Sequence, residues 1–187
     1  MDSLRTFIAI ELPPDVRARV AQHIACLRNE LPDVRAGWSR EDNLHLTLKF
    51  LGDVPIADIP RVSEAVAIAT KSVSSFELTF FDSGTFPPHG RPSVLWIGTP
   101  ASGLQALHAP IEEELAEAGF ARESRPFRPH LTIARLRHLQ GARQLAELHK
   151  SLRFAPIEFD VSEVVVFKSE LLTQGSKHTA ISRHELA

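Results

Sequence analysis

Residues 45–51 read HLTLKFL and residues 130–136 read HLTIARL, so one seven-residue pattern returns 85 positions later with His, Leu, Thr and the final Leu unchanged. Successive side chains of a β-strand point to opposite faces. Each copy therefore presents its histidine and threonine on one face and its aliphatic residues on the other. The recurrence predicts two similar lobes that face each other across a pseudo-twofold axis, with an imidazole on each wall of one groove. Chance recurrence of a β-rich heptapeptide is the alternative.

The residues on either side of the two copies predict alternating helices and strands joined by tight turns. Helices are expected at 15–31, 60–73, 104–118 and 141–152, and strands at 4–12, 34–38, 44–51, 76–81, 93–98, 130–136, 154–160, 163–168 and 179–185. Short β-β connections favour an α+β fold with antiparallel sheets over a doubly wound parallel sheet. We expect residues 1–187 to form a single domain of two lobes. The proline-rich loops at 86–92 and 124–129 are either ordered turns near a site or solvent-exposed loops.

The composition is that of an ordinary globular protein, with 187 residues and a formal net charge of -2. The single cysteine, Cys26, excludes an internal disulfide framework and is expected to be a half-buried helix thiol. The amino-terminal residues do not resemble a signal peptide and no run of about 18 apolar residues occurs, so we expect a cytoplasmic protein without a membrane association. The near-neutral charge disfavours a broad nucleic-acid surface, so any phosphate ligand must be held locally.

Two histidines that face each other suit in-line displacement at phosphorus. One imidazole deprotonates the attacking water and the other protonates the departing oxygen, and an unperturbed pKa of about 6.5 permits either role. The adjacent threonines can donate hydrogen bonds to the phosphoryl oxygens. No metal or other cofactor is required, and His-x-Thr is not a chelating pair. Other histidines are expected to be solvated loop or helix residues: His89, His108, His138 and His149.

Both copies resemble the paired His-x-Thr motifs of the 2H phosphoesterase superfamily, in particular its RNA 2′,3′-cyclic phosphodiesterases, once called 2′-5′ RNA ligases. The segments HLTLKFLG and RPFRPHLTIARL carry the resemblance, and TFIAIELP, FPPHGRPSVLWIGT and VVVFKSELLTQGSKH extend it in the expected order over nearly the whole chain. The resemblance implies two antiparallel lobes with outer helices around a central groove. It also implies hydrolysis of a 2′,3′-cyclic phosphate to a 2′-phosphate.

The resemblance further implies roles for individual residues. His45 is the acid that protonates the 3′ oxygen, His130 is the base that activates water, and Thr47 and Thr132 hold the phosphate. Phe50 contacts the nucleobase and Arg135 the phosphate, each five residues after its histidine. In a regular strand an odd offset turns these two side chains to the leucine face, so the assignments hold only if each strand bends or bulges.

The sequence leaves two interpretations for further basic residues. Arg125 and Arg128 either meet the RNA backbone or are solvated loop charges, and a functional role is slightly favoured for Lys49. Near the carboxyl end, Lys177 and His178 stand where the resemblance leads us to expect a tyrosine, and the chain contains no tyrosine.

The expected function is metal-independent hydrolysis of 2′,3′-cyclic phosphate by a monomeric enzyme. The expected partner is an RNA with a 2′,3′-cyclic phosphate end or a small cyclic nucleotide. Two alternatives use the same groove. One is 2′-5′ RNA ligation or linkage cleavage, and the other is a non-catalytic module that binds RNA ends.

Overall fold

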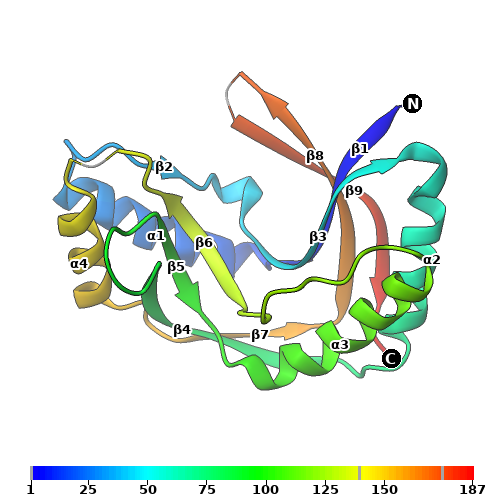
Figure 1. Ribbon diagram of the computed structural model, residues 1–187. Helices are drawn as coiled ribbons and strands as arrows, with labels where there is room; N and C mark the ends of the chain where they lie inside the picture. The colour runs from blue at the N-terminus through cyan, green and yellow to red at the C-terminus, as the bar shows by residue number, and fades with distance from the viewer. Residues whose placement is uncertain (1, 139, 174) are drawn as a thin grey trace.

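The fold consists of two antiparallel sheets with helices packed outside them, as Figure 1 shows. The computed structural model describes residues 2–138, 140–173 and 175–187. The strands are β1 (Ser3–Glu11), β2 (Gly37–Trp38), β3 (His45–Pro55), β4 (Phe76–Phe86), β5 (Val94–Gly98), β6 (His130–Arg135), β7 (Ile157–Val161), β8 (Glu163–Leu172) and β9 (Gly175–Glu185). The helices are α1 (Pro14–Glu30), α2 (Ile59–Thr70), α3 (Ala101–Glu117) and α4 (Ala142–Leu152), with short 3-10 turns η1 (Glu41–Asn43) and η2 (Ile56–Asp58).

Each copy of the repeated heptapeptide belongs to a different sheet. The four-stranded sheet has the order β3-β1-β8-β9 and the five-stranded sheet has the order β2-β6-β5-β4-β7. All neighbouring strands are antiparallel. The α+β class and the two lobes are therefore confirmed. Each lobe combines strands from both halves of the chain, because β1 pairs with β8 in one sheet and β4 pairs with β7 in the other.

Hydrophobic periodicity explains how the helices cover the sheets. In α1, Val16, Val20, Ile24 and Leu27 are buried on one face, and Pro14 occupies the first turn, where its missing N–H leaves no bond unmade. These residues join the main core together with the inward aliphatic residues of the strands. A second, smaller apolar cluster lies on the opposite face of the four-stranded sheet and consists of Phe7, Ala9, Val165 and Phe167.

Two strands extend well beyond the predicted bounds. β4 continues to Phe86 because residues 83–86 pair with residues 94–97 of β5. β8 and β9 extend into a long hairpin in which Ser169 lies opposite His178 and Leu172 opposite Gly175. Glycine, serine and proline indicate turns only on average, and cross-strand pairing overrides them here. The hairpin projects beyond its sheet in Figure 1.

Three predictions of exposure are wrong. Cys26 is exposed rather than half-buried. His149 is fully buried and His108 is 9% exposed, because each lies on the core face of its helix and hydrogen-bonds or stacks there. His89 and His138 are exposed, as predicted. Within the described part of the chain, no helix combines the length and the apolar composition needed to cross a bilayer.

Candidate active site

A β-bulge decides which side chains of the first copy share a face. Ala9 of β1 lies opposite Thr47, but Ile8 lies opposite Lys49, so Leu48 is an extra residue in β3. Opposed residues of an antiparallel pair project from the same face. The next pair is Phe7 with Phe50, and their ring centroids are 5.7 Å apart. The bulge therefore brings Phe50 to the face of the sheet that carries the histidine and the threonine.

The second copy contains a bulge at the same position. In β6, Thr132 lies opposite Trp96 and Ala134 opposite Leu95, so Ile133 is the extra residue. Arg135 then returns to the face of the threonine. Residues 45–50 and residues 130–135 have the same pattern of burial. In each, the first and third residues are half-buried, the second, fourth and fifth are buried, and the sixth is exposed. Both strands therefore contain the bulge that the assignments of Phe50 and Arg135 require.

The same bulges turn the fifth residue of each copy into the core. Lys49 is 5% exposed and Ala134 is fully buried. Lys49 thus points away from the face that carries His45 and Thr47.

Each motif histidine is held by the carbonyl two residues before it. His45 Nδ1 lies 2.8 Å from the carbonyl oxygen of Asn43, and His130 Nδ1 lies 2.7 Å from that of Arg128. A carbonyl oxygen only accepts hydrogen bonds, so Nδ1 of each ring is the donor and carries a proton. In the neutral ring Nε2 is then the unprotonated nitrogen, available to take up a proton.

Each motif histidine also packs against a phenylalanine of its own sheet. The ring centroids of Phe7 and His45 are 4.7 Å apart, and those of Phe86 and His130 are 4.9 Å apart. Phe86 begins the proline-rich loop 86–92, whose residues 87–91 are exposed. The loop therefore fits both earlier alternatives, because it is solvent-exposed yet starts beside a motif histidine.

The pKa of each motif histidine lies below the ordinary 6.5, which favours the neutral ring. Burial and the nearby His178 lower the pKa of His45 to about 4. Burial also lowers the pKa of His130, with a smaller contribution from Arg135. An anionic phosphate beside either ring would favour the imidazolium and raise its pKa.

The structure adds His178 to the site. Its ring lies 4.9 Å from the ring of His45 and 4.9 Å from that of Phe7, in edge-to-face orientation. Its Nδ1 is buried and has no hydrogen-bond partner among the described residues. Sequence reasoning left the role of this segment open. The presence of Lys177 and His178 where a tyrosine was expected marked the segment as unusual. The contact between His178 and His45, however, depends on the path of the hairpin.

A hydrogen bond explains why His178 reaches the site. Asn43 Nδ2 donates to the carbonyl oxygen of Ser176 at 2.6 Å, so the beginning of β9 lies against η1, just before His45. A pocket of about 110 Å³ opens here, lined by Glu11, Arg17, Asp42, Leu44, His45, Phe167, His178, Ala180 and Arg183. Arg17 and Arg183 are both paired with Glu11.

One short segment joins the two motifs. Ser39 donates from its backbone N–H to the carbonyl oxygen of Ile133 at 2.9 Å and from its hydroxyl to that of Thr132 at 2.8 Å. The chain then continues through η1 to His45, and β3 and β6 are in contact across the two lobes.

Thr47 and Thr132 are half-buried, and within residues 2–138, 140–173 and 175–187 their hydroxyls make no hydrogen bond. The hydroxyls are thus available to a ligand.

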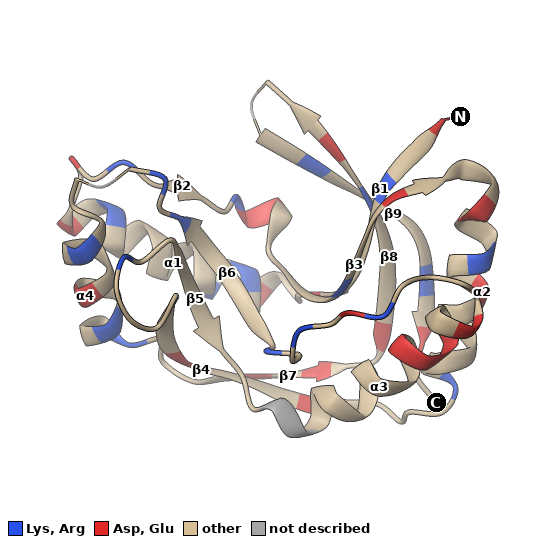
Figure 2. Ribbon diagram, viewed as in Figure 1, with Lys and Arg blue, Asp and Glu red and all other residues tan. Residues whose placement is uncertain are grey.

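Basic residues lie in the loop before β6 and near its far end (Figure 2). Arg125 is paired with Glu123 at 3.1 Å, and this contact lowers the pKa of the Glu123 carboxyl to about 2. Arg128 is exposed and fixes His130 through its carbonyl rather than its side chain. In the part of the chain that is described, no three His, Cys, Asp or Glu residues are grouped as metal ligands.

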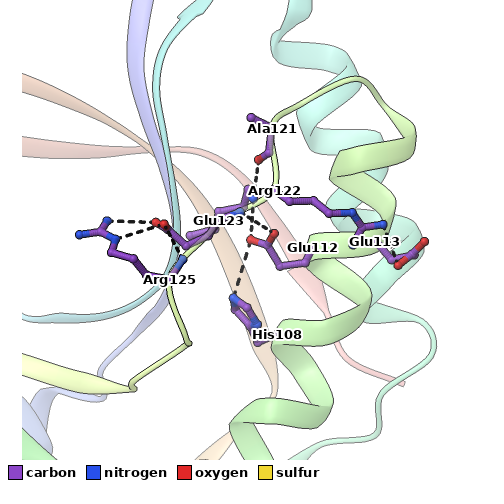
Figure 3. Close-up of polar contacts among 8 residues, drawn as sticks. His108, Glu112, Glu113, Ala121, Arg122, Glu123 and Arg125 are labelled. Atoms are coloured by element: carbon purple, nitrogen blue, oxygen red, sulfur yellow. Dashed lines mark hydrogen bonds and ion pairs between the residues drawn. The ribbon is translucent and has the colours of Figure 1, made fainter.

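Polar contacts join α3 to the loop that leads to the second motif (Figure 3), and the innermost of them are buried. Lys49 Nζ lies 2.5 Å from Glu112 Oε1, and Glu112 Oε2 accepts the N–H of Glu123 at 3.1 Å. His108, on the same face of α3, stacks on Phe127 with centroids 3.9 Å apart.

The chain is similar to known proteins in both sequence and fold. The family model described as the 2′-5′ RNA ligase superfamily matches residues 12–171. An RNA 2′,3′-cyclic phosphodiesterase of Thermotoga maritima is 31% identical over 173 residues, which cover 92% of this chain and 90% of the relative. Among solved structures, the TT0787 protein of Thermus thermophilus has a TM-score of 0.80 at 25% identity and covers 98% of both chains. E. coli LigT complexed with 3′-AMP has a TM-score of 0.76 at 26% identity, covering 100% of this chain and 99% of that one.

Proposed function

The chain belongs to the 2′-5′ RNA ligase superfamily, and on this premise we propose that it hydrolyses 2′,3′-cyclic phosphates at RNA ends or in nucleotides to 2′-phosphates. The observation that carries the proposal is the matched pair of bulged strands. Each strand presents a histidine with its Nδ1 tied to a backbone carbonyl and a threonine whose hydroxyl has no hydrogen-bond partner among the described residues. Relatives named RNA 2′,3′-cyclic phosphodiesterase support the same activity.

The proposed reaction needs one proton acceptor and one proton donor. Nε2 of His130 takes the proton of the attacking water, and the water oxygen forms a bond to phosphorus. The bond from phosphorus to the 3′ oxygen breaks, and protonated His45 gives its Nε2 proton to that oxygen. The product is a 2′-phosphate beside a free 3′ hydroxyl. The polarity of the two histidines follows the family resemblance, because the two strands offer equivalent nitrogens.

The other site residues bind the substrate in this proposal. The hydroxyls of Thr47 and Thr132 donate to the non-bridging phosphoryl oxygens, where negative charge builds up in the transition state. Arg135 adds a positive charge on the side of His130, and Phe50, 64% exposed, offers its ring to the nucleobase. No step uses a metal or a cofactor. The proposal treats the protein as a single-domain monomer.

The low pKa of His45 fits an acid that is charged only when substrate is bound. The cyclic phosphate is an anion, and its approach raises the pKa of a neighbouring imidazole. His45 is thus expected to take up its proton together with the substrate.

The direct test is incubation of the protein with cytidine 2′,3′-cyclic phosphate in the presence of EDTA, followed by phosphorus NMR of the product. Appearance of the 2′-phosphate alone, at a rate unaffected by EDTA, is the expected result. Absence of hydrolysis, a 3′-phosphate product or complete dependence on an added divalent metal would contradict the proposal.

A second candidate activity, 2′-5′ ligation, rests on the description of the matching family. Ligation is the reverse of opening such a phosphodiester, so the same groove would serve both directions. Water is in large excess, and we therefore expect hydrolysis to dominate. Incubating an RNA with a cyclic phosphate end together with an RNA with a 5′ hydroxyl separates the two, because net ligation accumulates a 2′-5′ linked product. Tight binding without turnover would indicate the non-catalytic alternative.

A further inference from the structure

The two copies of the repeated strand differ at the residue that their bulges turn into the core. The second copy has Ala134 there, which suits a core position, whereas the first copy has Lys49. A buried ammonium group is costly unless it is paired and hydrogen-bonded. The first copy thus carries a charged group where the second carries a methyl group. We therefore expect Lys49 to have a role that Ala134 does not have.

The partners of Lys49 belong to the segment between the two motifs. Its Nζ lies 2.5 Å from Oε1 of Glu112 on α3 and donates to the carbonyl oxygen of Ala121 at 2.9 Å. The other oxygen of Glu112 accepts the backbone N–H of Glu123 at 3.1 Å. Lys49 and Glu112 thus fix the backbone on both sides of Arg122 in the loop after α3 (Figure 3).

The loop after α3 continues to the second motif, and His108 of α3 contacts it a second time at Phe127. His108 lies one helical turn before Glu112, with its Nε2 3.7 Å from Glu112 Oε1. Its ring stacks on Phe127, with an angle of 9° between the planes. The next residue, Arg128, supplies the carbonyl that holds Nδ1 of His130. An unbroken series of contacts therefore runs from the strand of the first histidine to the second histidine.

We propose that Lys49 and Glu112 are positioning residues that set the orientation of His130, by tying the loop before the second motif to the strand of the first. The catalytic part of this inference rests on the proposed function. The pair lies in the interior, where a hydrogen-bonded ion pair is rigid and poorly screened by solvent. Neither residue touches the substrate. Their effect on the reaction passes through the carbonyl of Arg128, since a shift of that group moves the imidazole bound to it.

The test uses three variants, Lys49→Met, Glu112→Gln and the double variant, with Glu113→Gln as the matched control. Glu113 is the next residue of α3 and pairs with Arg122 on the surface, with 57% of its side chain exposed. Single variants leave one buried charge without its partner and lose stability. The double variant removes both charges, so it remains interpretable if a single variant does not fold.

We expect the folded single and double variants to lose about 10-fold to 100-fold in kcat, the scale of a misplacement of about 1 Å, with KM changed by less than about 3-fold. The double variant should lose no more than either single variant, because both changes break one link. Glu113→Gln should retain the wild-type kcat. The inference would be overturned by a wild-type kcat in the folded double variant or by additive losses of kcat in the two single variants. It would also be overturned if the fraction of unfolded protein explained the whole loss of activity.

Histidine NMR separates this inference from the proposed function. In the double variant the ring signals and the pKa of His130 should change, while those of His45 stay as in the wild type. These spectra need no turnover. If the wild type proves inactive, the proposed function fails, and the spectra alone decide whether the pair orients His130. Unchanged signals of His130 in the folded double variant would overturn the inference in either case.

Discussion

The imidazole of His178 lies edge to face against that of His45, with ring centroids 4.9 Å apart and an angle of 73° between the planes. This contact joins the carboxyl-terminal hairpin to the first motif. Burial is the main reason why the pKa of His45 falls to about 4, and the second imidazole lowers it further.

Replacing His178 by phenylalanine should therefore raise the pKa of His45 while keeping an aromatic ring against it. The value should remain below 6.5, because burial persists. Proton NMR titration of the His45 ring measures the change. His184→Phe is the control, since His184 lies on the same strand but bonds to Ser182 and Ser63, and it should leave the pKa of His45 unchanged. An equal shift in both variants would argue against a specific contact.

Removing either motif histidine should stop most of the hydrolysis. His45→Ala and His130→Ala each lose a proton-transfer group, so we expect kcat to fall by about 100-fold or more. His138→Ala is the control, because His138 is exposed and lies outside the motif. Steady-state assays with a 2′,3′-cyclic nucleotide measure the loss. Retention of the full rate by either motif variant would exclude two-histidine catalysis.

Loss of a threonine hydroxyl should weaken stabilisation of the transition state. For Thr47→Val or Thr132→Val we expect kcat/KM to fall by about 10-fold to 100-fold, since a donor to the charged oxygens is removed at nearly constant shape. Thr47→Ser and Thr132→Ser keep a hydroxyl and should recover most of the activity. If the valine variants act like wild type, the hydroxyls do not contact the phosphate.

The pH dependence of kcat/KM should have its optimum below pH 6.5. The reaction requires His45 protonated and His130 neutral, and kcat/KM reports the pKa values of the free enzyme. Both values lie below the ordinary 6.5, so the protonated acid is lost as the pH rises towards neutrality. For kcat, the bound phosphate raises the pKa of His45, and the alkaline limb should move to higher pH. An optimum of kcat/KM at pH 7 or above would contradict this protonation scheme.

The free energy of unfolding should fall in mild acid because of a histidine pair in which His23 is half-buried and His149 is fully buried. His149 Nε2 donates to the carbonyl oxygen of Trp96 at 3.0 Å, so its Nδ1 accepts from His23 Nε2 at 3.1 Å. Burial, with a contribution from His149, lowers the pKa of His23 from 6.5 to about 4, so the unfolded chain binds more protons between these values. Stability is therefore full above pH 6.5 and declines as the pH falls towards 4.

Urea denaturation at pH 7 and pH 4.5 measures this decline. With allowance for the partial exposure of His23, we expect the pair to contribute about 1 kcal/mol of the difference. His23→Leu should reduce the pH dependence of the free energy of unfolding, and His138→Ala should not. An unchanged dependence in His23→Leu would assign the acid sensitivity to other groups.

Local pattern was sufficient to predict most helices and strands and the inward faces of both motif strands. Period-two alternation predicted that His45 and Thr47 share a face, because two residues along a strand return to the same side. The assignments of Phe50 and Arg135 depended on bulges. A bulge is a property of two paired strands, so neither heptapeptide shows it alone.

The sequence by itself determined the two histidine and threonine strands through residue spacing, the α+β class through the order of the elements and their short connections, and the family through the resemblance of its motifs. The tertiary structure alone decided that β1 and β3 share a sheet with β8 and β9, that His178 meets His45, and that Lys49 turns inward to Glu112. Each of these is a contact between segments distant in the chain. Such contacts arise from pairing register and packing in three dimensions, which no local periodicity encodes.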